Sequence, residues 1–416
     1  MKVCSKCNEL KELDKFRKNK TKCRQCLNQE NAINHIYTRK IKIYPNKNQK
    51  ETFDFWIRKC KYLYNVALEE KIVYYKSTGK YLNIYEQKKE LVDIKDFDSS
   101  WKDVPNKSLQ EIIFRVDKSF KSFFKGGGFP KFKSVLDSIE FVKNDVRLKD
   151  NKLFLPKIKE SVKCSETIKN NWTSVKLSKD KDSYYLIFYY SEERKINLIN
   201  NEILGIDLGL MSLYTDSNGK KVNRFSKKLI SKYYGRISEL NKSLSSKRKN
   251  SIKFKKVKKQ LGKTYDRLKD TKNDYLHKES LNLVKNSKES IISLGDIKIK
   301  SIIDNKNSKR SLIKSFYLNS LGIFKQYVVY KSVKNNKLCL LIDERMTSKT
   351  CSCCGNIKCD LKLSDRIYNC LVCKNSIDRD ENSAINMKLL GSSSLSKDKL
   401  VSLTGNNKLL TFEYNL

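Results

Sequence analysis

ILGIDLGLMSLYTDSNGKKV, residues 203–222, alternates apolar residues with small or polar ones and therefore predicts a β-hairpin. Asn218 and Gly219 mark a turn near its end. Asp207 lies in the middle of the first strand. Aspartate is a poor strand residue, and a buried carboxylate needs a cation or hydrogen-bond donors. Asp207 is therefore a candidate functional residue, although a surface aspartate near a turn would give the same pattern.

Strand-like and helical stretches flank this hairpin on both sides. Predicted strands lie at 37–45, 139–199, 290–299 and 337–344, and predicted helices at 46–124, 227–270, about 308–330 and from about 380 onward. Three glycines and a proline in KGGGFPKFKS, residues 125–134, separate the first helical stretch from the strands that follow it.

The composition favours a nucleic acid as the partner. The chain has 416 residues, of which 88 are Lys or Arg and 46 are Asp or Glu, for a net charge of +42. Such a charge destabilises a compact chain by self-repulsion unless a polyanion neutralises it. No apolar run approaches the 18–20 residues of a membrane helix, and MKVCSKC at Met1 has no apolar signal core. We expect no membrane association, no secretion, and a location in the nucleus or another DNA-containing compartment, such as a viral factory for a giant-virus protein.

Eight of the thirteen cysteines form CxxC pairs. Cys4 and Cys7 are followed after 15 residues by Cys23 and Cys26, and Cys351 and Cys354 are followed after 15 residues by Cys370 and Cys373. Two CxxC turns can surround one zinc ion with four thiolates, which leaves no open position for a substrate. The spacing predicts two structural Zn²⁺ sites; redox thiols or chance clustering are the alternatives. Only two histidines are present, which disfavours Ser-His-Asp or Cys-His catalysis.

Asp380 lies in SIDRDENSAIN, directly after the second cysteine group and at the start of the closing helix. An aspartate at this place often only caps the helix. Its occurrence together with Asp207, with a zinc site between the two in sequence, favours a functional role.

At this point the chain resembles a known family. YLYNVALEE (62–70), FPKFKS (129–134), GIDLGLMSLYT (205–215), TSKTCSCCG (347–355) and YNCLVCKNSIDRDENSAINM (368–387) resemble the TnpB transposon-associated RNA-guided nucleases and the related Fanzor proteins, which are relatives of type V CRISPR effectors. The last two stretches together are the specific ones. The resemblance covers residues 37 to 390 and identifies Asp207 and Asp380 with the first and last of three family carboxylates.

The resemblance implies an α/β, multidomain fold. Its parts are an RNase H-like (RuvC) nuclease domain at 201–346 and 376–390, an inserted zinc ribbon at 347–375 that binds the target nucleic acid, a β-barrel wedge domain at 35–47 and 126–200, a helical recognition lobe at 48–125, an N-terminal zinc finger at 1–34 and a flexible tail at 391–416.

The middle carboxylate departs from the family pattern. Where most TnpB proteins have Glu-Asp-Leu, this chain has Gly295-Asp296-Ile297. Asp296 is shifted by one residue and should face the other side of the sheet, because neighbouring strand residues alternate. The site is then either incomplete or completed from a neighbouring strand. Many Fanzor proteins carry a glutamate before the ribbon, and this pattern favours Glu344 over the adjacent Asp343. A solvated acidic pair at a strand end is the alternative.

A complete site would hold two Mg²⁺ or Mn²⁺ ions about 4 Å apart, which activate water and stabilise the leaving oxygen. The resemblance then implies an RNA-guided, metal-dependent DNA endonuclease of a transposable element, which cleaves target DNA beside a short flanking motif. A catalytically inactive RNA-guided DNA-binding protein is the main alternative, and a guide-independent nuclease or zinc-finger transcription factor is a weaker one. The expected partners are guide RNA and double-stranded DNA; the oligomeric state is left open.

Lysine-rich stretches are the expected contacts to phosphate. They comprise Lys131, Lys133, Lys247, Arg248, Lys249, Lys253, Lys255 and Lys256. Phosphate contacts give affinity without sequence information, so the guide would supply sequence by base pairing.

Overall fold

The computed structural model describes residues 2–3, 10–11, 33–150, 152–194, 199–297, 315–316, 319–362 and 364–396. The predicted zinc ligands Cys4, Cys7, Cys23 and Cys26 lie outside this part of the chain. The described chain divides into two compact units, an amino-terminal unit over Ile36–Glu192 and a carboxy-terminal unit that starts at Glu193.

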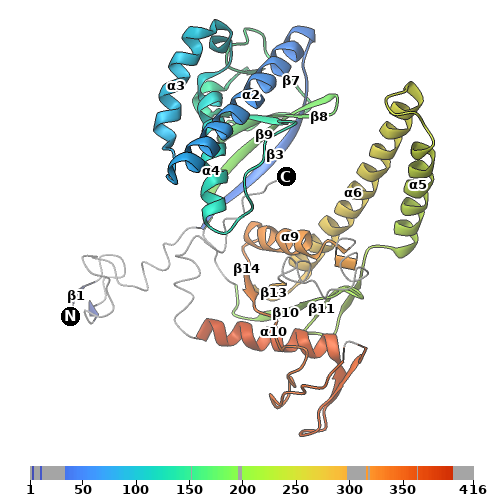
Figure 1. Cartoon of the computed structure of the whole chain (residues 1–416). Coiled ribbons are helices and arrows are strands. Elements are labelled where there is room, and N and C mark those ends of the chain that lie inside the picture. Colours follow the sequence, from blue (N-terminus) through green and yellow to red (C-terminus); the bar gives the residue numbers. More distant parts are fainter. Residues whose placement is uncertain are drawn as a thin grey trace. The chain divides into compact units, whose positions relative to one another are not determined.

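The amino-terminal unit packs helices on a five-stranded sheet with the strand order β4-β8-β9-β3-β7 (Figure 1). The strands are β3 (Ile33–Tyr44), β4 (Ser138–Val142), β7 (Lys163–Cys164), β8 (Trp172–Asp180) and β9 (Ser183–Arg194), and a small separate sheet pairs β5 (Arg147–Lys149) with β6 (Lys152–Phe154). The helices are α2 (Lys47–Thr78), α3 (Ile84–Phe97) and α4 (Asn106–Phe124), with short 3₁₀ turns at Ser99–Asp103 and Lys143–Asp145. Among the described strands this sheet is open, with β4 and β7 at its two edges. The predicted β-barrel is therefore not seen as a closed barrel.

Local sequence signals account for the ends of α2. Asn46 accepts a hydrogen bond from the N–H of Gln49 at 2.8 Å, and the Gln49 side chain accepts one from the N–H of Asn46 at 3.2 Å, which forms a capping box. The helix ends at Gly79, whose φ of 66° is left-handed. Inside the unit, Trp56 is fully buried and packs against Phe53 and the strand residue Phe141, so helices and sheet share one core.

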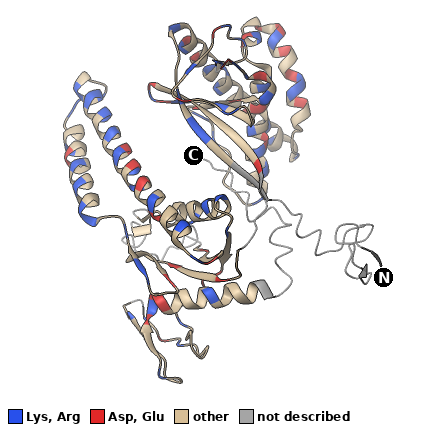
Figure 2. Ribbon diagram, turned by 180° about the vertical axis from the view of Figure 1, so that it is seen from behind, with Lys and Arg blue, Asp and Glu red and all other residues tan. Residues whose placement is uncertain are grey.

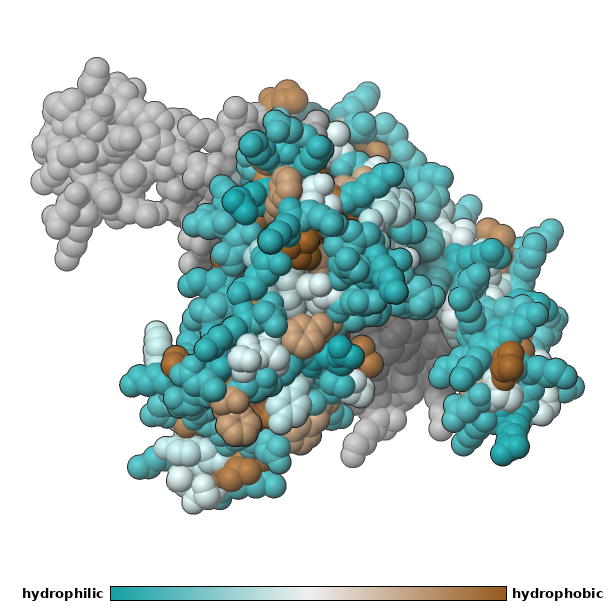
Figure 3. Space-filling model, turned by 90° about the horizontal axis from the view of Figure 1, so that it is seen from above, coloured by the Kyte–Doolittle hydropathy of each residue, from teal (hydrophilic) through white to brown (hydrophobic). Residues whose placement is uncertain are grey.

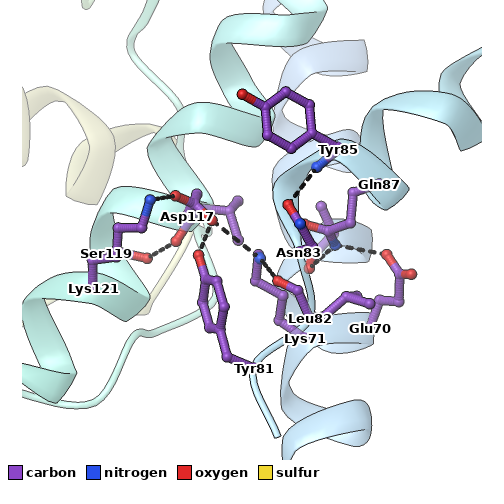
Figure 4. A network of polar contacts seen from close by, with 12 residues as sticks. Glu70, Lys71, Tyr81, Leu82, Asn83, Tyr85, Gln87, Asp117, Ser119 and Lys121 are labelled. Carbon is purple, nitrogen blue, oxygen red and sulfur yellow. Dashed lines mark hydrogen bonds and ion pairs between the residues drawn. The ribbon is translucent and has the colours of Figure 1, made fainter.

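A buried ion pair joins α2 to α4 in this unit (Figure 4). Lys71 and Asp117 are both almost fully buried, and the Lys71 Nζ lies 3.3 Å from an Asp117 oxygen and 2.6 Å from the main-chain oxygen of Leu82. Tyr81 and Lys121 complete the carboxylate's partners. Burial lowers the pKa of Lys71, against the opposing effect of Asp117. Removal of either charge would leave the other buried and unpaired, at a cost of about 3–5 kcal/mol.

The carboxy-terminal unit is built on a mixed five-stranded sheet with the order β12-β11-β10-β13-β14. Its strands are β10 (Ile203–Leu208), β11 (Ser212–Asp216), β12 (Lys221–Asn223), β13 (Ile291–Gly295) and β14 (Leu338–Ile342). The predicted hairpin is confirmed as the antiparallel pair β10–β11, and Asn218-Gly219 forms the next turn, between β11 and β12. Strands β10, β13 and β14 run parallel, so their carboxyl ends share one edge.

Helices cover both faces of this sheet. On one face pack α6 (Ile252–Asn286) and α9 (Leu321–Lys334), and on the other lies α10 (Arg379–Ser396), which runs beneath the sheet in Figure 1. The predicted helical run 227–270 is not continuous: α5 (Lys227–Ser245) and α6 form a hairpin around Asn250, whose φ is 67°. The α10 helix continues past residue 391 into the stretch predicted as a flexible tail, because Gly391 packs on Ser293.

Strand alternation determines which residues meet α10. Leu204, Ile206 and Leu208 join the core with α6 and α9. Gly205, between them, faces α10 so closely that an added Cβ would lie 2.0 Å from the main-chain oxygen of Ala384. The α10 helix can dock here only because position 205 has no side chain.

We predict that Gly205→Ala lowers the free energy of unfolding by about 3 kcal/mol or more, because the clash is with helix backbone that cannot rotate away. The matched control is Gly235→Ala in α5, where an added Cβ meets nothing within 4 Å. That variant should be neutral or stabilised by up to about 1 kcal/mol. Urea unfolding of both variants makes the comparison, and equal stabilities would contradict this account of the docking.

Candidate active site and zinc site

The three predicted carboxylates lie at the carboxyl edge of the parallel strands, where α/β sheets commonly place their ligands. Asp207 is near the end of β10 and has the same strand parity as Gly205, so it points to the α10 face. The hydroxyl of Ser383, on α10, donates a hydrogen bond to Asp207 Oδ1 at 2.9 Å. Burial raises the pKa of Asp207 to about 7.

The Glu344 side chain lies where a side chain at position 295 would lie. Gly295 ends β13 on the α10 face, and a Cβ added there would lie 2.7 Å from Glu344 Oε2. Glu344 follows β14 with the parity of Leu340 and Ile342, which pack on the same side of the sheet. The carboxylate of Glu344 therefore enters the volume that a side chain at position 295 would fill.

The neighbouring acidic residues point elsewhere. Asp296 forms an ion pair with Lys325 of α9 at 2.6 Å, on the opposite face of the sheet from α10. Asp343 is exposed and pairs with Arg345 at 2.7 Å. The pairing of Asp296 agrees with the alternation argument, and the pairing of Asp343 with Arg345 leaves Glu344 as the residue of the pair beside Gly295. Glu344 is half-buried, and burial raises its pKa to about 7, with a smaller contribution from Asp296.

Asp380 lies in the first turn of α10 but does not cap it. The carboxylate of Asp378 accepts hydrogen bonds from the N–H groups of Asp380 and Glu381, at 2.9 and 3.2 Å, and so takes the capping role. The Asp380 side chain is 17% exposed and lies 3.4 Å from the Arg379 guanidinium. The capping explanation for Asp380 is therefore wrong, since its neighbour performs that task.

These carboxylates affect one another electrostatically. Burial has the largest effect on the pKa of Asp207. The hydrogen bond from Ser383 lowers this pKa, the negative charges of Asp380 and Glu344 raise it further, and the charge of Arg379 lowers it. The three groups are not drawn into a single tight cluster: among the described residues, only the four ribbon cysteines bring their ligand atoms within 4.8 Å of one another. The arrangement is a shared acidic site on the α10 face, with Arg379 at its border.

The second cysteine group forms the predicted four-thiol cluster. The Sγ atoms of Cys351 and Cys373 lie 3.6 Å apart, as do those of Cys354 and Cys370. Each CxxC turn is followed by a residue with positive φ, Gly355 at 76° and Lys374 at 58°. The cluster is suited to Zn²⁺, while the nearby exposed thiols Cys353 and Cys359 stand outside it.

Short strands connect the cysteine cluster to the rest of the fold. The ribbon contains β15 (Ile367–Asn369) and β16 (Ser376–Asp378), which pair antiparallel. Tyr368 is fully buried beside the cysteines, and its hydroxyl lies 3.1 Å from the main-chain oxygens of Lys349 and Asn356, to either of which it can donate. The ribbon therefore has a small core of its own around the cluster.

The residues predicted to contact phosphate lie in two places. Lys131 and Lys133 are exposed in the loop after α4, and the main chain of Lys133 is held by Asn65 through hydrogen bonds of 2.8 and 3.0 Å. The second group lies at the end of the α5–α6 hairpin, where Figure 2 shows Lys and Arg along both helices. There, Arg248, Lys249, Lys253, Lys255 and Lys256 are exposed, whereas Lys247 turns back onto Ser243. The face in Figure 3 is mostly hydrophilic, with scattered apolar residues.

The sequence did not reveal the polar residues of α10 that contact the lead-in to the ribbon. Asn382 and Asn386 donate hydrogen bonds to the main-chain oxygen of Thr350, each at 2.7 Å, and Asn386 also donates to that of Thr347 at 2.8 Å. The only available signal was their spacing of four residues, which places both asparagines on one helix face.

No described helix is long and apolar enough to cross a membrane.

We predict that Cys370→Ser reduces the zinc content by one ion per chain relative to wild type and exposes the ribbon to proteolysis, because the metal supplies much of the folding energy of such small sites. Cys353→Ser is the control, since this exposed thiol lies in the same ribbon but outside the cluster. Metal analysis of both proteins is the measurement. An equal loss of zinc in the two variants would refute the ligand assignment.

Comparison with protein families gives three matches. A model described as "Cas12f1-like, TNB domain" matches residues 322–387, one described as "Probable transposase" matches residues 187–306, and a "Helix-turn-helix domain" model matches residues 37–80. The last region contains β3 and the single long helix α2 in the structure.

Comparison with individual proteins and solved structures gives similar relatives. "Putative RNA-guided DNA endonuclease InsQ" of Escherichia coli (strain K12) is 24% identical over 87% of this chain and 94% of its own length. "TnpB-like protein L770" of Acanthamoeba polyphaga mimivirus is 26% identical over 86% of this chain and 73% of its own. The structure titled "Cryo-EM structure of the Cas12f1-sgRNA-target DNA complex" shares the fold, with a TM-score of 0.53 at 13% identity over 82% of this chain and 83% of that one. The chain is thus similar to proteins described as RNA-guided DNA endonucleases and as TnpB-like, and residues 187–306 match the transposase model.

Proposed function

We propose that this chain is an RNA-guided, divalent-metal-dependent DNA endonuclease whose catalytic residues are Asp207, Glu344 and Asp380. The observation that carries the proposal is the position of the Glu344 carboxylate, 2.7 Å from where a Cβ of residue 295 would lie and on the same face as Asp207. The site is then of the rearranged kind expected for a Fanzor protein, with the glutamate supplied by the strand next to the usual one.

The carboxylates fit hard divalent cations. Mg²⁺ and Mn²⁺ prefer oxygen ligands, and all three side chains offer them. The raised pKa values of Asp207 and Glu344, both about 7, mean that burial of their charge is not fully compensated within the chain. A bound cation would supply this compensation and, in a two-ion site, would lower the pKa of a water and stabilise the leaving oxygen of the phosphodiester.

The chain's own residues would position the metal ligands and bind the nucleic acid. Asp207 belongs to β10, Glu344 follows β14 and Asp380 belongs to α10, so the candidate ligands come from three parts of the chain to one edge of the sheet. Arg379, which lies 3.4 Å from the Asp380 carboxylate, is the cation that would contact a phosphate of the cleaved strand in this proposal. The positive charge of the chain would hold nucleic acid, with the lysines of the α5–α6 hairpin and of the 131–133 loop contacting backbone phosphates.

The partners follow from the relatives. A guide RNA would select the target by base pairing, and the protein would read a short flanking motif in double-stranded DNA. In this proposal the strands of the amino-terminal unit act as the wedge domain, its helices as the recognition lobe, and residues 347–375 as the target-binding ribbon. The inactive alternative depends on the lost carboxylate at position 295, and the nearness of Glu344 to that position supports the active protein instead.

We predict that Glu344→Ala lowers the rate of DNA cleavage by at least about 100-fold, since loss of a direct ligand should exceed the 10–100-fold typical of residues that only orient ligands. Asp343→Ala is the matched control, because this adjacent carboxylate is exposed and paired with Arg345. Cleavage of a plasmid by the protein with its co-purified RNA and Mg²⁺ is the assay. Cleavage that survives in Glu344→Ala and is lost in Asp207→Ala would disprove the role of Glu344.

Cation binding should depend on pH in a defined direction. Both carboxyl pKa values, about 7 in the folded chain, lie above the ordinary values of 3.8 and 4.5. In the cation-free chain these two groups therefore contribute stability that is present at acidic pH and is lost as pH rises from about 4 to 7, where they ionise. A cation must displace these protons below pH 7, so its affinity should fall by about tenfold per pH unit for each protonated ligand.

Calorimetric titration of Mg²⁺ at several pH values, in buffers of different ionisation enthalpy, measures this linkage. We expect proton release upon binding near pH 6 and almost none above pH 8. Asp207→Asn should remove part of the release. An affinity that is constant between pH 6 and 8 would contradict the described electrostatics.

A further inference from the structure

Two buried hydroxyl groups connect Asp207 to the segment that carries Glu344. Ser383 Oγ donates to Asp207 Oδ1 at 2.9 Å and lies 3.0 Å from Thr347 Oγ1. Thr347 Oγ1 in turn lies 2.8 Å from the main-chain oxygen of Glu344 and can donate to it. A continuous chain of short polar contacts therefore runs from one candidate ligand to the backbone of another.

Both hydroxyls are shielded from water, since Ser383 is 2% exposed and Thr347 is 4% exposed. Each carries only one proton. When Ser383 donates to an ionised Asp207 it can only accept from Thr347, so the Thr347 hydroxyl then donates to Ser383 and not to Glu344. The main-chain oxygen of Glu344 still accepts from the Thr347 N–H at 3.2 Å. When Ser383 gives its proton to Asp207, it occupies one lone pair of Oδ1 and limits rotation of the carboxylate. The remaining lone pairs of Asp207 are then directed away from Ser383 and are available to a cation.

Helix α10, which carries Ser383, also holds the segment around Thr347. Through Asn386 and Asn382, α10 holds the main-chain oxygens of Thr347 and Thr350, and the N–H of Ser352 donates back to Asn382 at 2.9 Å. The segment that follows Glu344 is therefore bound to α10 by buried side chains at several successive points. Asp380 lies one helical turn before Ser383 on this helix, so α10 sets the relative positions of all three carboxylates.

We propose that Ser383 and Thr347 are positioning residues, which hold Asp207 and Glu344 at the separation needed for a shared divalent cation. This inference rests on the proposed function, because it assumes that the carboxylates bind the cation. Orienting partners of metal ligands typically contribute 10–100-fold to metal affinity. The role belongs to the hydroxyls themselves and differs from general support of the helix.

The test compares Ser383→Ala with Ser332→Ala. Ser332 is likewise a fully buried helix serine, but it lies in α9, where its hydroxyl donates to the main-chain oxygen of Val328 at 2.8 Å. The readouts are the affinity for Mn²⁺ alone, measured by calorimetry, and the rise in unfolding temperature that Mn²⁺ causes in the full chain. We expect Ser383→Ala to weaken binding by about tenfold and Ser332→Ala to leave it unchanged.

Further variants separate positioning from packing. Ser383→Thr and Thr347→Ser retain a hydroxyl and should restore most of the affinity, whereas Thr347→Val should weaken binding several-fold. The double variant of Ser383→Ala and Thr347→Val should bind about as weakly as Ser383→Ala alone, because groups that act as one chain are not additive. Equal Mn²⁺ affinity in Ser383→Ala and Ser332→Ala, or full additivity of the two losses, would overturn the proposal.

Asp207→Ala distinguishes this proposal from the one on which it rests. If that variant loses Mn²⁺ binding while Ser383→Ala retains it, the positioning role is wrong and the catalytic assignment stands. If Asp207→Ala binds Mn²⁺ and cleaves DNA like the wild type, the proposed function fails, and the positioning role fails with it.

Discussion

Close contact between α10 and the sheet is the constraint on which the carboxy-terminal unit depends. At Gly205 the helix backbone occupies the place of a side chain, and at Gly391 the helix presents no side chain of its own to Ser293. Ser293 also donates to the main-chain oxygen of Met387 at 2.6 Å. A helix this close to the strands brings its short polar side chains, Ser383 and Asp380, to the level of Asp207 at the end of β10. Helix and strand residues can then act on one site without long, flexible side chains.

Strand parity explains how the acidic site tolerates glycine at position 295. A carboxylate can reach a given point above a sheet from its own strand or from the adjacent one, provided that its side chain points to the same face. Glu344 meets this condition because it shares the parity of Leu340 and Ile342. Asp296 fails it despite being next in sequence, and its pairing with Lys325 across the sheet shows where its charge is compensated.

Much of this could be predicted from the sequence because the decisive patterns are local. Alternation in 203–222 gave the hairpin, and the CxxC spacing gave the cluster at Cys351, Cys354, Cys370 and Cys373. The position of Glu344 against Gly295 agrees with the prediction that a neighbouring strand supplies the missing carboxylate; its catalytic role stays a prediction. The break between α5 and α6 was missed, because lysine-rich sequence continues through Asn250 without proline or glycine. The capping role of Asp378 and the contacts of Ser383 were missed because they depend on how α10 docks, which no local pattern encodes.

The path from β14 to the ribbon has an evolutionary consequence. Under the proposed function, position 295 needs no charge of its own, since Glu344 lies in the space of its side chain, but the segment from Glu344 to Cys351 acquires a fixed length. An insertion or deletion of a single residue there would leave Glu344 in place but shift Thr347 and Thr350 away from their asparagines. Among descendants of this chain, the lead-in should tolerate exchanges of side chains at its exposed positions while its residue count is conserved, and variation in length should accumulate elsewhere in the ribbon.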